Sequence, residues 1–286
     1  MSYSQKGPPV PLDLDDLSTV PLDDVLERVE QRLGRQLKRQ DGHYSQWNGT
    51  AGFPTDADTW IRLAWRRTEK INTQAWTGFE AAAAIEGVPR PQWSAAAVWS
   101  DASRGIVWRA DEMTLTSDPA LSSTGDIAAD PHLSEQWWAD LHSALFNLAG
   151  HSTDRVAMGQ THLSARIHEI YGDQVDTTIT DWACAHGDLG YANLCGPRLT
   201  IIDWESWGMG PVGWDAACLW SASLAIPALA ERILILFEDV LATRTGRLSR
   251  LLLCANTARA FRRTGKPAPQ TKTMAAVAES LLTELR

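Results

Sequence analysis

The sequence predicts an α+β protein of two lobes, and three observations support this class. The chain has 286 residues, which is long for a single layer of secondary structure and fits two lobes sharing one cleft. Patterns typical of β-strands concentrate in the first half, at 59–65, 95–100 and 105–110. Patterns typical of amphipathic helices dominate from Ser134 onward. We therefore expect a small lobe with a β-sheet and a larger, mainly helical lobe.

The composition excludes several classes of protein. Hydrophobic residues make up 44% and charged residues 21% of the chain, as in ordinary globular proteins. The 26 basic and 35 acidic residues give a net charge of −9, which argues against a nucleic-acid partner and weakly favours cationic small molecules. The four cysteines lack C-x-x-C spacing, so we expect neither a metal cluster nor a disulfide framework. We find no secretory apolar segment and no membrane-span pattern, and we expect a cytoplasmic protein with no membrane partner.

The first elements are predicted from turn and capping residues. We expect residues 1–20 to be a flexible leader. A helix should begin at Pro21, a favoured first-turn residue, and end at Gly34. Residues 36–47 are typical of a strand or a broken hairpin, and 48–52 of a small polar loop.

One helix and three strands complete the predicted first lobe. Thr59–Trp65 alternates between apolar and polar residues, as a strand does. A single helix, the one expected to pack on the sheet, is predicted from 73 to 86 because Gly87 and Pro89 follow it. The strands at 95–100 and 105–110 are separated by a short polar turn.

Helices are predicted over most of the second half. Residues 117–131 have the composition of a loop, after which Ser134 is a candidate N-cap for a helix that ends at Gly150. Periodic apolar residues predict the next helix over 154–171. Further helices are predicted from about 216 and near 228–244, 247–263 and 272–285.

The chemistry-bearing residues concentrate between His186 and Asp215. Asp188 is followed five positions later by Asn193 and ten further by Asp203. Apolar residues precede His186 and Asp203, so buried strands should hold these polar groups in place. A tight Gly-Pro-Arg turn lies between them, and it predicts a hairpin over 194–203. Amide and carboxylate oxygens suit Mg²⁺, and a carboxylate beside a hydroxyl can receive its proton.

This pattern resembles the aminoglycoside phosphotransferase and choline kinase-like family. That family carries HGD-x-x-x-x-N followed by a strand ending in I-D-W-E or I-D-W-D, and residues 186–193 and 202–205 match it. A Gly-rich loop ending in an aspartate is matched by 208–215. The match covers about 30 residues of the C-terminal core. The resemblance implies a bilobal protein-kinase-like fold and transfer of a phosphoryl group from a nucleoside triphosphate.

The resemblance also implies roles for five residues of the core. Asp188 would be the catalytic carboxylate on the acceptor side, and Asn193 and Asp203 would hold Mg²⁺. His186 would shape the catalytic loop through hydrogen bonds, although a general-base histidine is the rival interpretation. Asp215 would anchor the same loop, and a helix N-cap role could coexist with this.

Two residues of the first lobe receive roles from the resemblance. Arg62 occupies the place of the basic residue that contacts the nucleotide phosphates, and Glu80 would pair with it. Arg66 or Arg67 could serve instead, and Glu80 could be a solvated residue of an amphipathic helix. The loop at 48–52 occupies the place of the phosphate-covering loop, but an ordinary hairpin turn fits it equally well.

We therefore expect a leader at 1–20, a nucleotide-binding lobe at 21–113 with a hinge near 110–116, and a helical acceptor-binding lobe at 114–286. The expected activity is phosphorylation of an alcohol group, with ATP or GTP as co-substrate and Mg²⁺ as cofactor. The acceptor would be a small molecule that could be cationic, such as an aminoglycoside or another antibiotic, which would make the protein a resistance enzyme. A primary-metabolite kinase for choline, an amino alcohol or a sugar is one alternative. A catalytically silent nucleotide-binding or partner-binding module is the other.

Overall fold

The computed structural model describes residues 14–46 and 48–286. The chain divides into two compact units, of which one comprises the chain up to Thr73 together with Gln92–Thr116. The other comprises Gln74–Pro91 and Ser117–Arg286. Residues 1–13 of the predicted leader lie outside the described residues. The leader prediction is wrong for its last part, because Leu17–Thr19 form a 3-10 turn (η1) whose Leu17 is buried in the core.

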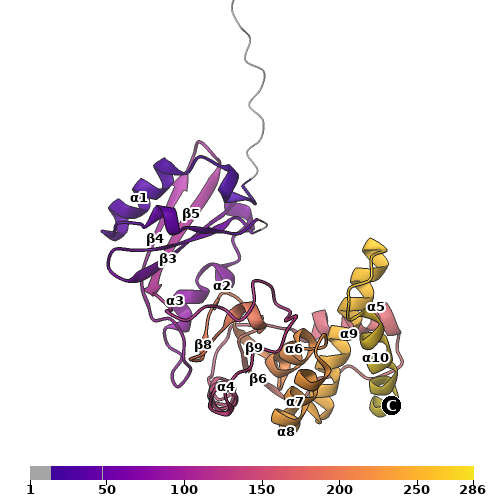
Figure 1. Cartoon of the computed structure of the whole chain (residues 1–286). Helices are drawn as coiled ribbons and strands as arrows, with labels where there is room; N and C mark the ends of the chain where they lie inside the picture. Colours follow the sequence, from indigo (N-terminus) through magenta and orange to yellow (C-terminus); the bar gives the residue numbers. More distant parts are fainter. Residues whose placement is uncertain (1–13, 47) are drawn as a thin grey trace, which may run out of the picture. The chain divides into compact units, whose positions relative to one another are not determined.

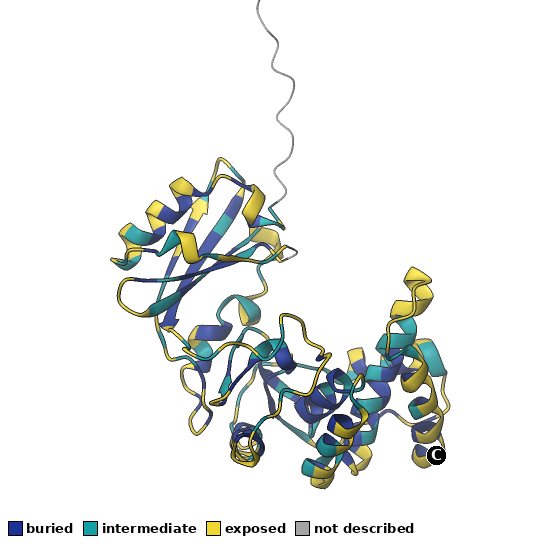
Figure 2. Ribbon diagram, in the orientation of Figure 1, coloured by how far each residue is buried: buried dark blue, intermediate teal, exposed yellow. Residues whose placement is uncertain are grey.

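The first unit contains an antiparallel sheet of five strands in the order β1-β2-β3-β5-β4 (Figure 1). The helix α1 (Asp23–Leu33) packs its apolar face against this sheet and ends at Gly34, which has a left-handed conformation. Figure 2 shows buried residues along β3 and β5, where Ile61, Leu63 and Trp108 are fully buried. The predicted first helix and the three predicted strands are confirmed. The strands are β1 (His43–Tyr44), β2 (Thr50–Pro54), β3 (Thr59–Arg66), β4 (Trp93–Asp101) and β5 (Ile106–Thr114).

Two segments of this unit differ from the prediction. Thr50–Pro54 pairs with β3 and is the strand β2, so only the beginning of the predicted 48–52 loop is a turn. The segment 110–114 was predicted to be part of a hinge. It is instead the end of β5, because the ladder between β3 and β5 continues as far as Thr114. Short 3-10 turns lie at Arg39–Asp41 (η2) and Thr68–Lys70 (η3).

The single helix predicted over 73–86 is interrupted. The structure has α2 (Thr73–Trp76) and α3 (Gly78–Ala82), with Thr77 between them outside the helical region. Glycine is a poor helix former, which favours a break at this position. A Cβ atom on Gly78 would lie 2.5 Å from backbone atoms of Trp204 and Glu205, so only glycine permits this close approach.

The second unit is mainly helical, as predicted. The Ser134 side chain accepts a hydrogen bond from the Trp137 N–H and caps the first long helix, as expected. The long helix α9 packs against α5, α6 and α10. The helices are α4 (Glu135–Ala149), α5 (Gln160–Tyr171), α6 (Trp214–Ala222), α7 (Pro227–Leu236), α8 (Glu238–Leu241), α9 (Arg244–Thr264) and α10 (Thr271–Leu285). None of the helices in the described residues has the length and apolar composition of a membrane-spanning segment.

Two small antiparallel ribbons complete this unit. The hairpin predicted over 194–203 is confirmed as β7 (Leu194–Cys195) paired with β8 (Thr200–Ile201). The strand β6 (Trp182–Ala185) pairs with β9 (Gly208–Pro211). The Gly-rich stretch was predicted to be a loop, and this is wrong for 208–211, because its backbone completes the ladder with β6.

Candidate active site

The residue that follows β6 is fixed from two sides. His186 is 0% exposed, and its backbone N–H donates to one oxygen of Asp215 at 2.6 Å. The Gly187 N–H donates to the other oxygen at 3.0 Å. The His186 Nε2 lies 2.9 Å from the Ile202 carbonyl oxygen and therefore donates to it. Burial raises the pKa of Asp215, and its hydrogen bonds with His186 and Gly187 oppose that shift.

The same Ile202 peptide is also bound through its N–H. That N–H donates to the Asn193 carbonyl oxygen at 2.9 Å, and the Asn193 side-chain Nδ2 donates to the Asp188 carbonyl oxygen at 2.7 Å. One hydrogen-bonded framework therefore joins the backbone of Asp188 and Asn193 to the peptide that precedes Asp203. Asp203 itself has φ +64°, a left-handed conformation that is uncommon outside glycine but tolerated by aspartate.

Two carboxylates of this framework have no partner in the part of the chain that the structure describes. Neither the exposed Asp188 side chain nor the half-buried Asp203 side chain makes a hydrogen bond or an ion pair there. Asp215, in contrast, uses both oxygens on backbone N–H groups. Asp188 and Asp203 are thus available to bind a proton, a metal ion or a ligand, whereas Asp215 supports the loop.

The residues present fit a magnesium ion held with help from a substrate. Nowhere in residues 14–46 and 48–286 do three or more His, Cys, Asp or Glu side chains gather into a group that could hold a metal. An ion here would take the Asp203 carboxylate and the Asn193 amide oxygen, with phosphates and water completing its shell. Mg²⁺ is commonly bound in this way, by one or two protein oxygens with substrate phosphates and water.

Two glycines allow the segments of the site to approach closely. Gly187 has φ +89°, and a Cβ atom there would lie 2.5 Å from the Ser206 carbonyl oxygen and 2.9 Å from the Ala157 Cβ. Gly208 in β9 is equally confined, because a Cβ atom would lie 2.6 Å from the Arg155 backbone. The His-Gly-Asp motif and the Gly-rich stretch therefore need glycine at these positions for steric reasons.

One segment of the site was not predicted from the sequence. Residues 155–158 were predicted to be helical, but α5 begins only at Gln160. The Met209 N–H donates to the Arg155 carbonyl at 2.7 Å, and the N–H groups of Ala157 and Met158 donate to the Met209 carbonyl at 2.9 and 3.1 Å. These partners lie more than 50 positions apart in the sequence, so no local pattern indicates the pairing.

The two candidate nucleotide-binding residues lie in different units. Arg62 lies in β3, in register with Asp111 of β5. Glu80 lies in the first turn of α3. Their predicted pairing with each other and with a nucleotide stays a prediction.

Comparison with known proteins identifies the fold. No protein-family model matches the chain, and no curated protein matches its sequence. Solved structures of small-molecule phosphotransferases do match it. The predicted α+β, protein-kinase-like fold is confirmed, and so, at the level of the fold, is the resemblance to the aminoglycoside phosphotransferase and choline kinase-like family.

Three of these structures illustrate the likeness. Aminoglycoside phosphotransferase APH(4)-Ia has a TM-score of 0.55 at 9% identity, over 92% of this chain and 99% of that one. Macrolide 2′-phosphotransferase MphH from Brachybacterium faecium has a TM-score of 0.53 at 16% identity, over 93% and 98%. Amicoumacin kinase hAmiN, in complex with AMP-PNP, Ca²⁺ and amicoumacin, has a TM-score of 0.52 at 10% identity, over 93% and 94%.

Proposed function

We propose that this protein is a cytoplasmic phosphotransferase that moves the γ-phosphate of ATP or GTP onto a hydroxyl of a small molecule. One observation carries the proposal. Two carboxylates without partners among the described residues, Asp188 and Asp203, belong to the same hydrogen-bonded framework as Asn193. The fold adds support, because the amicoumacin kinase that shares it was solved with AMP-PNP and a divalent cation.

Each residue has a defined task in this reaction. Asp188 orients the acceptor hydroxyl and receives its proton, which is transferred late because the transition state is loose. Asn193 and Asp203 hold Mg²⁺, which when bound neutralises charge on the phosphates. Asp215 fixes the backbone that leads into Asp188, and His186 fixes the peptide that leads into Asp203. Arg62 of the first unit contacts the nucleotide phosphates, and Glu80 of the second unit pairs with Arg62.

The acceptor that we favour is an aminoglycoside or another antibiotic, so that the protein confers resistance. The compared structures include an aminoglycoside phosphotransferase, a macrolide phosphotransferase and an amicoumacin kinase. The net charge of −9 adds weak support for a cationic acceptor. A silent nucleotide-binding module is disfavoured, since it would have no use for a second carboxylate free on the acceptor side.

Single-turnover phosphoryl transfer tests the proposal. Excess protein is mixed with γ-labelled ATP or GTP, Mg²⁺ and a panel of aminoglycosides, macrolides, amicoumacin, choline, ethanolamine and sugars. We expect label on one antibiotic class, and no transfer in EDTA. Label on choline, ethanolamine or a sugar alone would show that the acceptor is a primary metabolite and not an antibiotic. Nucleotide binding without transfer to any acceptor would favour the silent module, and the absence of nucleotide binding would contradict the proposal.

A further inference from the structure

Arg155 is a partly buried cation without a carboxylate partner among the described residues. Its Nε donates to the Trp207 carbonyl at 3.0 Å, and its Nη2 donates to the Glu205 carbonyl at 3.1 Å. The guanidinium carbon also lies 4.6 Å from the centre of the Trp207 ring. Burial lowers the pKa of Arg155. A partly buried charge that binds only backbone and a ring is costly, so its position calls for an explanation.

The two carbonyls that Arg155 binds belong to the segment directly after Asp203. Glu205 and Trp207 follow it by two and four positions, and the next residues enter β9. The Arg155 carbonyl accepts from the Met209 N–H, so both the side chain and the backbone of Arg155 hold this segment. The planar guanidinium offers two donors in a fixed fork, which sets the direction of both carbonyls at once.

The segment around Arg155 also reaches the catalytic loop. Ala157 lies against Gly187, where an added Cβ atom would be 2.9 Å from the Ala157 Cβ. Residues 155–158 therefore contact both the segment that follows Asp203 and the loop that precedes Asp188. Since Asp203 has a left-handed backbone, its conformation must be maintained by its surroundings. The guanidinium fork is suited to that purpose.

We infer that Arg155 is a positioning residue that fixes the Asp203 carboxylate in the orientation required for metal binding. This inference rests on the proposed function, because it assigns Asp203 to the metal. Arg155 acts through the backbone of the segment after Asp203 and touches neither the metal nor the nucleotide. Residues that orient metal ligands from outside the coordination shell typically contribute about 10–100-fold to metal affinity or activity.

The chain offers a matched control in Arg250. Its guanidinium carbon also lies 4.6 Å from a tryptophan ring, that of Trp220, and burial also lowers its pKa. Arg250 lies in α9 and stacks on α6, and in the described structure it makes no hydrogen bond with residues 203–209. Arg250→Ala thus removes the same kind of stacking without releasing the segment after Asp203.

The test measures how much Mg²⁺ tightens AMP-PNP binding, by calorimetry with Mg²⁺ and with EDTA. In Arg155→Ala we expect this tightening to fall about 10-fold or more, with metal-free affinity within about twofold of wild type. Arg155→Lys keeps the charge but not the fork, and should lose at least about threefold. Arg250→Ala should keep the wild-type tightening although its melting temperature falls. In ligand-free protein, amide exchange at 205–209 should accelerate only in the Arg155 variants.

Three results would overturn the inference. The first is a folded Arg155→Ala with wild-type tightening, or, if that variant does not fold, Arg155→Lys with wild-type tightening. The second is an equal loss in Arg155→Ala and Arg250→Ala, which would indicate general destabilisation. The third is wild-type protein whose AMP-PNP binding ignores Mg²⁺, which would remove the proposed metal site and this inference together.

Discussion

At the scale of single residues, the site depends on glycines that no other residue can replace. Gly187 has φ +89°, and a Cβ atom added there would lie 2.5 Å from a backbone atom.

 The neighbouring atom is the Ser206 carbonyl oxygen, which belongs to the backbone and cannot rotate away. Gly265 has a left-handed conformation with φ +66° but no atom within 4 Å of its added Cβ, so it isolates the cost of the left-handed conformation alone.

We therefore predict that Gly265→Ala lowers the free energy of unfolding by about 1 kcal/mol, as expected for an L-residue in the left-handed region. Gly187→Ala should cost at least about 1 kcal/mol more, because the backbone around residue 187 must move away from Ser206. Urea unfolding of both variants measures the difference. Equal losses in the two variants would show that the close approach at Gly187 has no energetic importance.

Two substitutions at Asp203 separate the effect of its left-handed backbone from the effect of its carboxylate. Asparagine tolerates the left-handed region at least as well as aspartate, whereas alanine does not. We predict that Asp203→Asn keeps the wild-type free energy of unfolding within about 0.5 kcal/mol, and that Asp203→Ala loses about 1 kcal/mol. Both variants should lose the tightening of nucleotide binding by Mg²⁺, because the carboxylate is absent. Calorimetry showing unchanged tightening in either variant would exclude Asp203 as the metal ligand.

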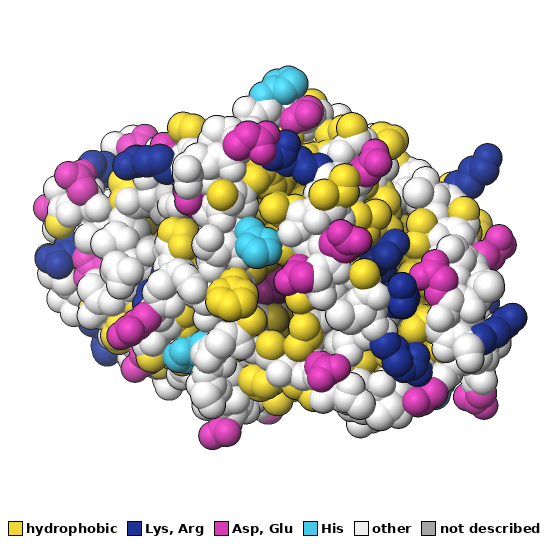
Figure 3. Space-filling model, turned by 90° about the horizontal axis from the view of Figure 1, so that it is seen from below, with side chains coloured by type: hydrophobic (Ala, Val, Ile, Leu, Met, Phe, Trp, Pro, Cys, Tyr) yellow, Lys and Arg dark blue, Asp and Glu magenta, His cyan; other side chains and the backbone are white. Residues whose placement is uncertain are grey.

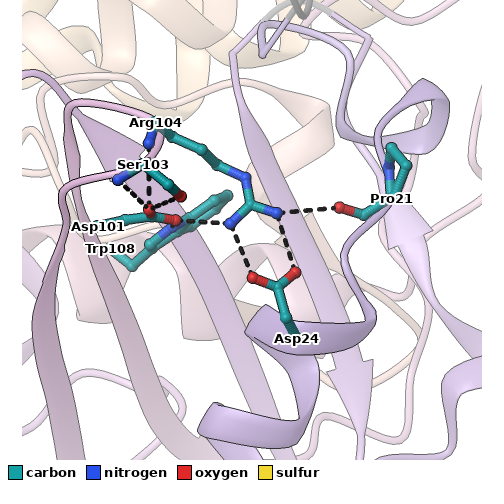
Figure 4. A network of polar contacts seen from close by, with 6 residues as sticks. All are labelled: Pro21, Asp24, Asp101, Ser103, Arg104 and Trp108. Atoms are coloured by element: carbon teal, nitrogen blue, oxygen red, sulfur yellow. Dashed lines mark hydrogen bonds and ion pairs between the residues drawn. The ribbon is translucent and has the colours of Figure 1, made fainter.

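At the scale of elements, an ionic network fastens the start of α1 to the turn between β4 and β5 (Figure 4). The Arg104 guanidinium donates to both oxygens of Asp24 at 2.8 and 2.9 Å, and to Asp101 at 2.6 Å. Asp101 also accepts from the Ser103 hydroxyl at 2.6 Å and from the Trp108 indole at 3.1 Å. Burial pushes the pKa of Asp101 upward, but these hydrogen bonds outweigh it and hold the pKa well below its usual range.

The lowered pKa of Asp101 determines how the stability that this residue contributes depends on pH. Because the folded state favours ionised Asp101, the stabilisation is fully present above the unfolded pKa, near 4, and is lost as pH falls through the folded pKa. We predict that Asp101→Asn lowers the free energy of unfolding by about 1–3 kcal/mol at pH 7, with a smaller loss near pH 2.5. Urea unfolding at both pH values measures this. Asp23→Asn, at an 88% exposed side chain, is the control and should change little. A loss independent of pH would contradict the assignment.

Elements with a local cause were predictable from the sequence. The helix after Pro21, the Ser134 cap and the 194–203 hairpin depend on residues within a few positions, and all three form. Elements whose cause is distant were not predictable. Gly208–Pro211 forms a strand because it pairs with β6. Residues 155–158 are not helical because their backbone forms hydrogen bonds with Met209.

The residues of the candidate site also fall into two groups, those that the sequence predicts and those that only the structure reveals. The motif spacing indicated Asp188, Asn193 and Asp203, because those residue types follow from the chemistry of metal and proton binding. It did not indicate Arg155, whose two acceptors are backbone carbonyls and carry no sequence signature. Residues that hold a site through the backbone of a distant segment become visible only in the structure.

At the scale of the whole molecule, the likeness to phosphotransferases covers more than nine-tenths of the chain at 9–16% identity. The fold is therefore shared although most side chains differ. Because one fold can carry many functions, the function has to be inferred from the residues of the site. On the face shown in Figure 3, acidic and basic side chains are interspersed with hydrophobic ones.

A ligand that binds only the folded state raises the free energy of unfolding, and the gain grows with the logarithm of the ligand concentration above its dissociation constant. With AMP-PNP and Mg²⁺ at about 100 times the dissociation constant, the gain is about 2.7 kcal/mol. For a chain of this size we predict a rise in melting temperature of about 5–10 °C. The rise should shrink when EDTA replaces Mg²⁺, and calorimetric scans of wild-type protein measure both values. The same rise in EDTA would contradict a metal-linked nucleotide site.

The central claim is that Asp188 performs phosphoryl transfer chemistry at an acceptor hydroxyl, and the rate of Asp188→Asn tests it most directly. The rate is measured in single turnover with the acceptor that wild-type protein phosphorylates, beside AMP-PNP affinity and melting temperature. Asp173→Asn, which neutralises a 96% exposed carboxylate of the same unit, is the matched control. We predict that Asp188→Asn lowers the rate by about 10²–10⁴-fold while affinity and melting temperature stay at the wild-type values, and that the control changes none of the three. Transfer by Asp188→Asn at a near wild-type rate would contradict the claim.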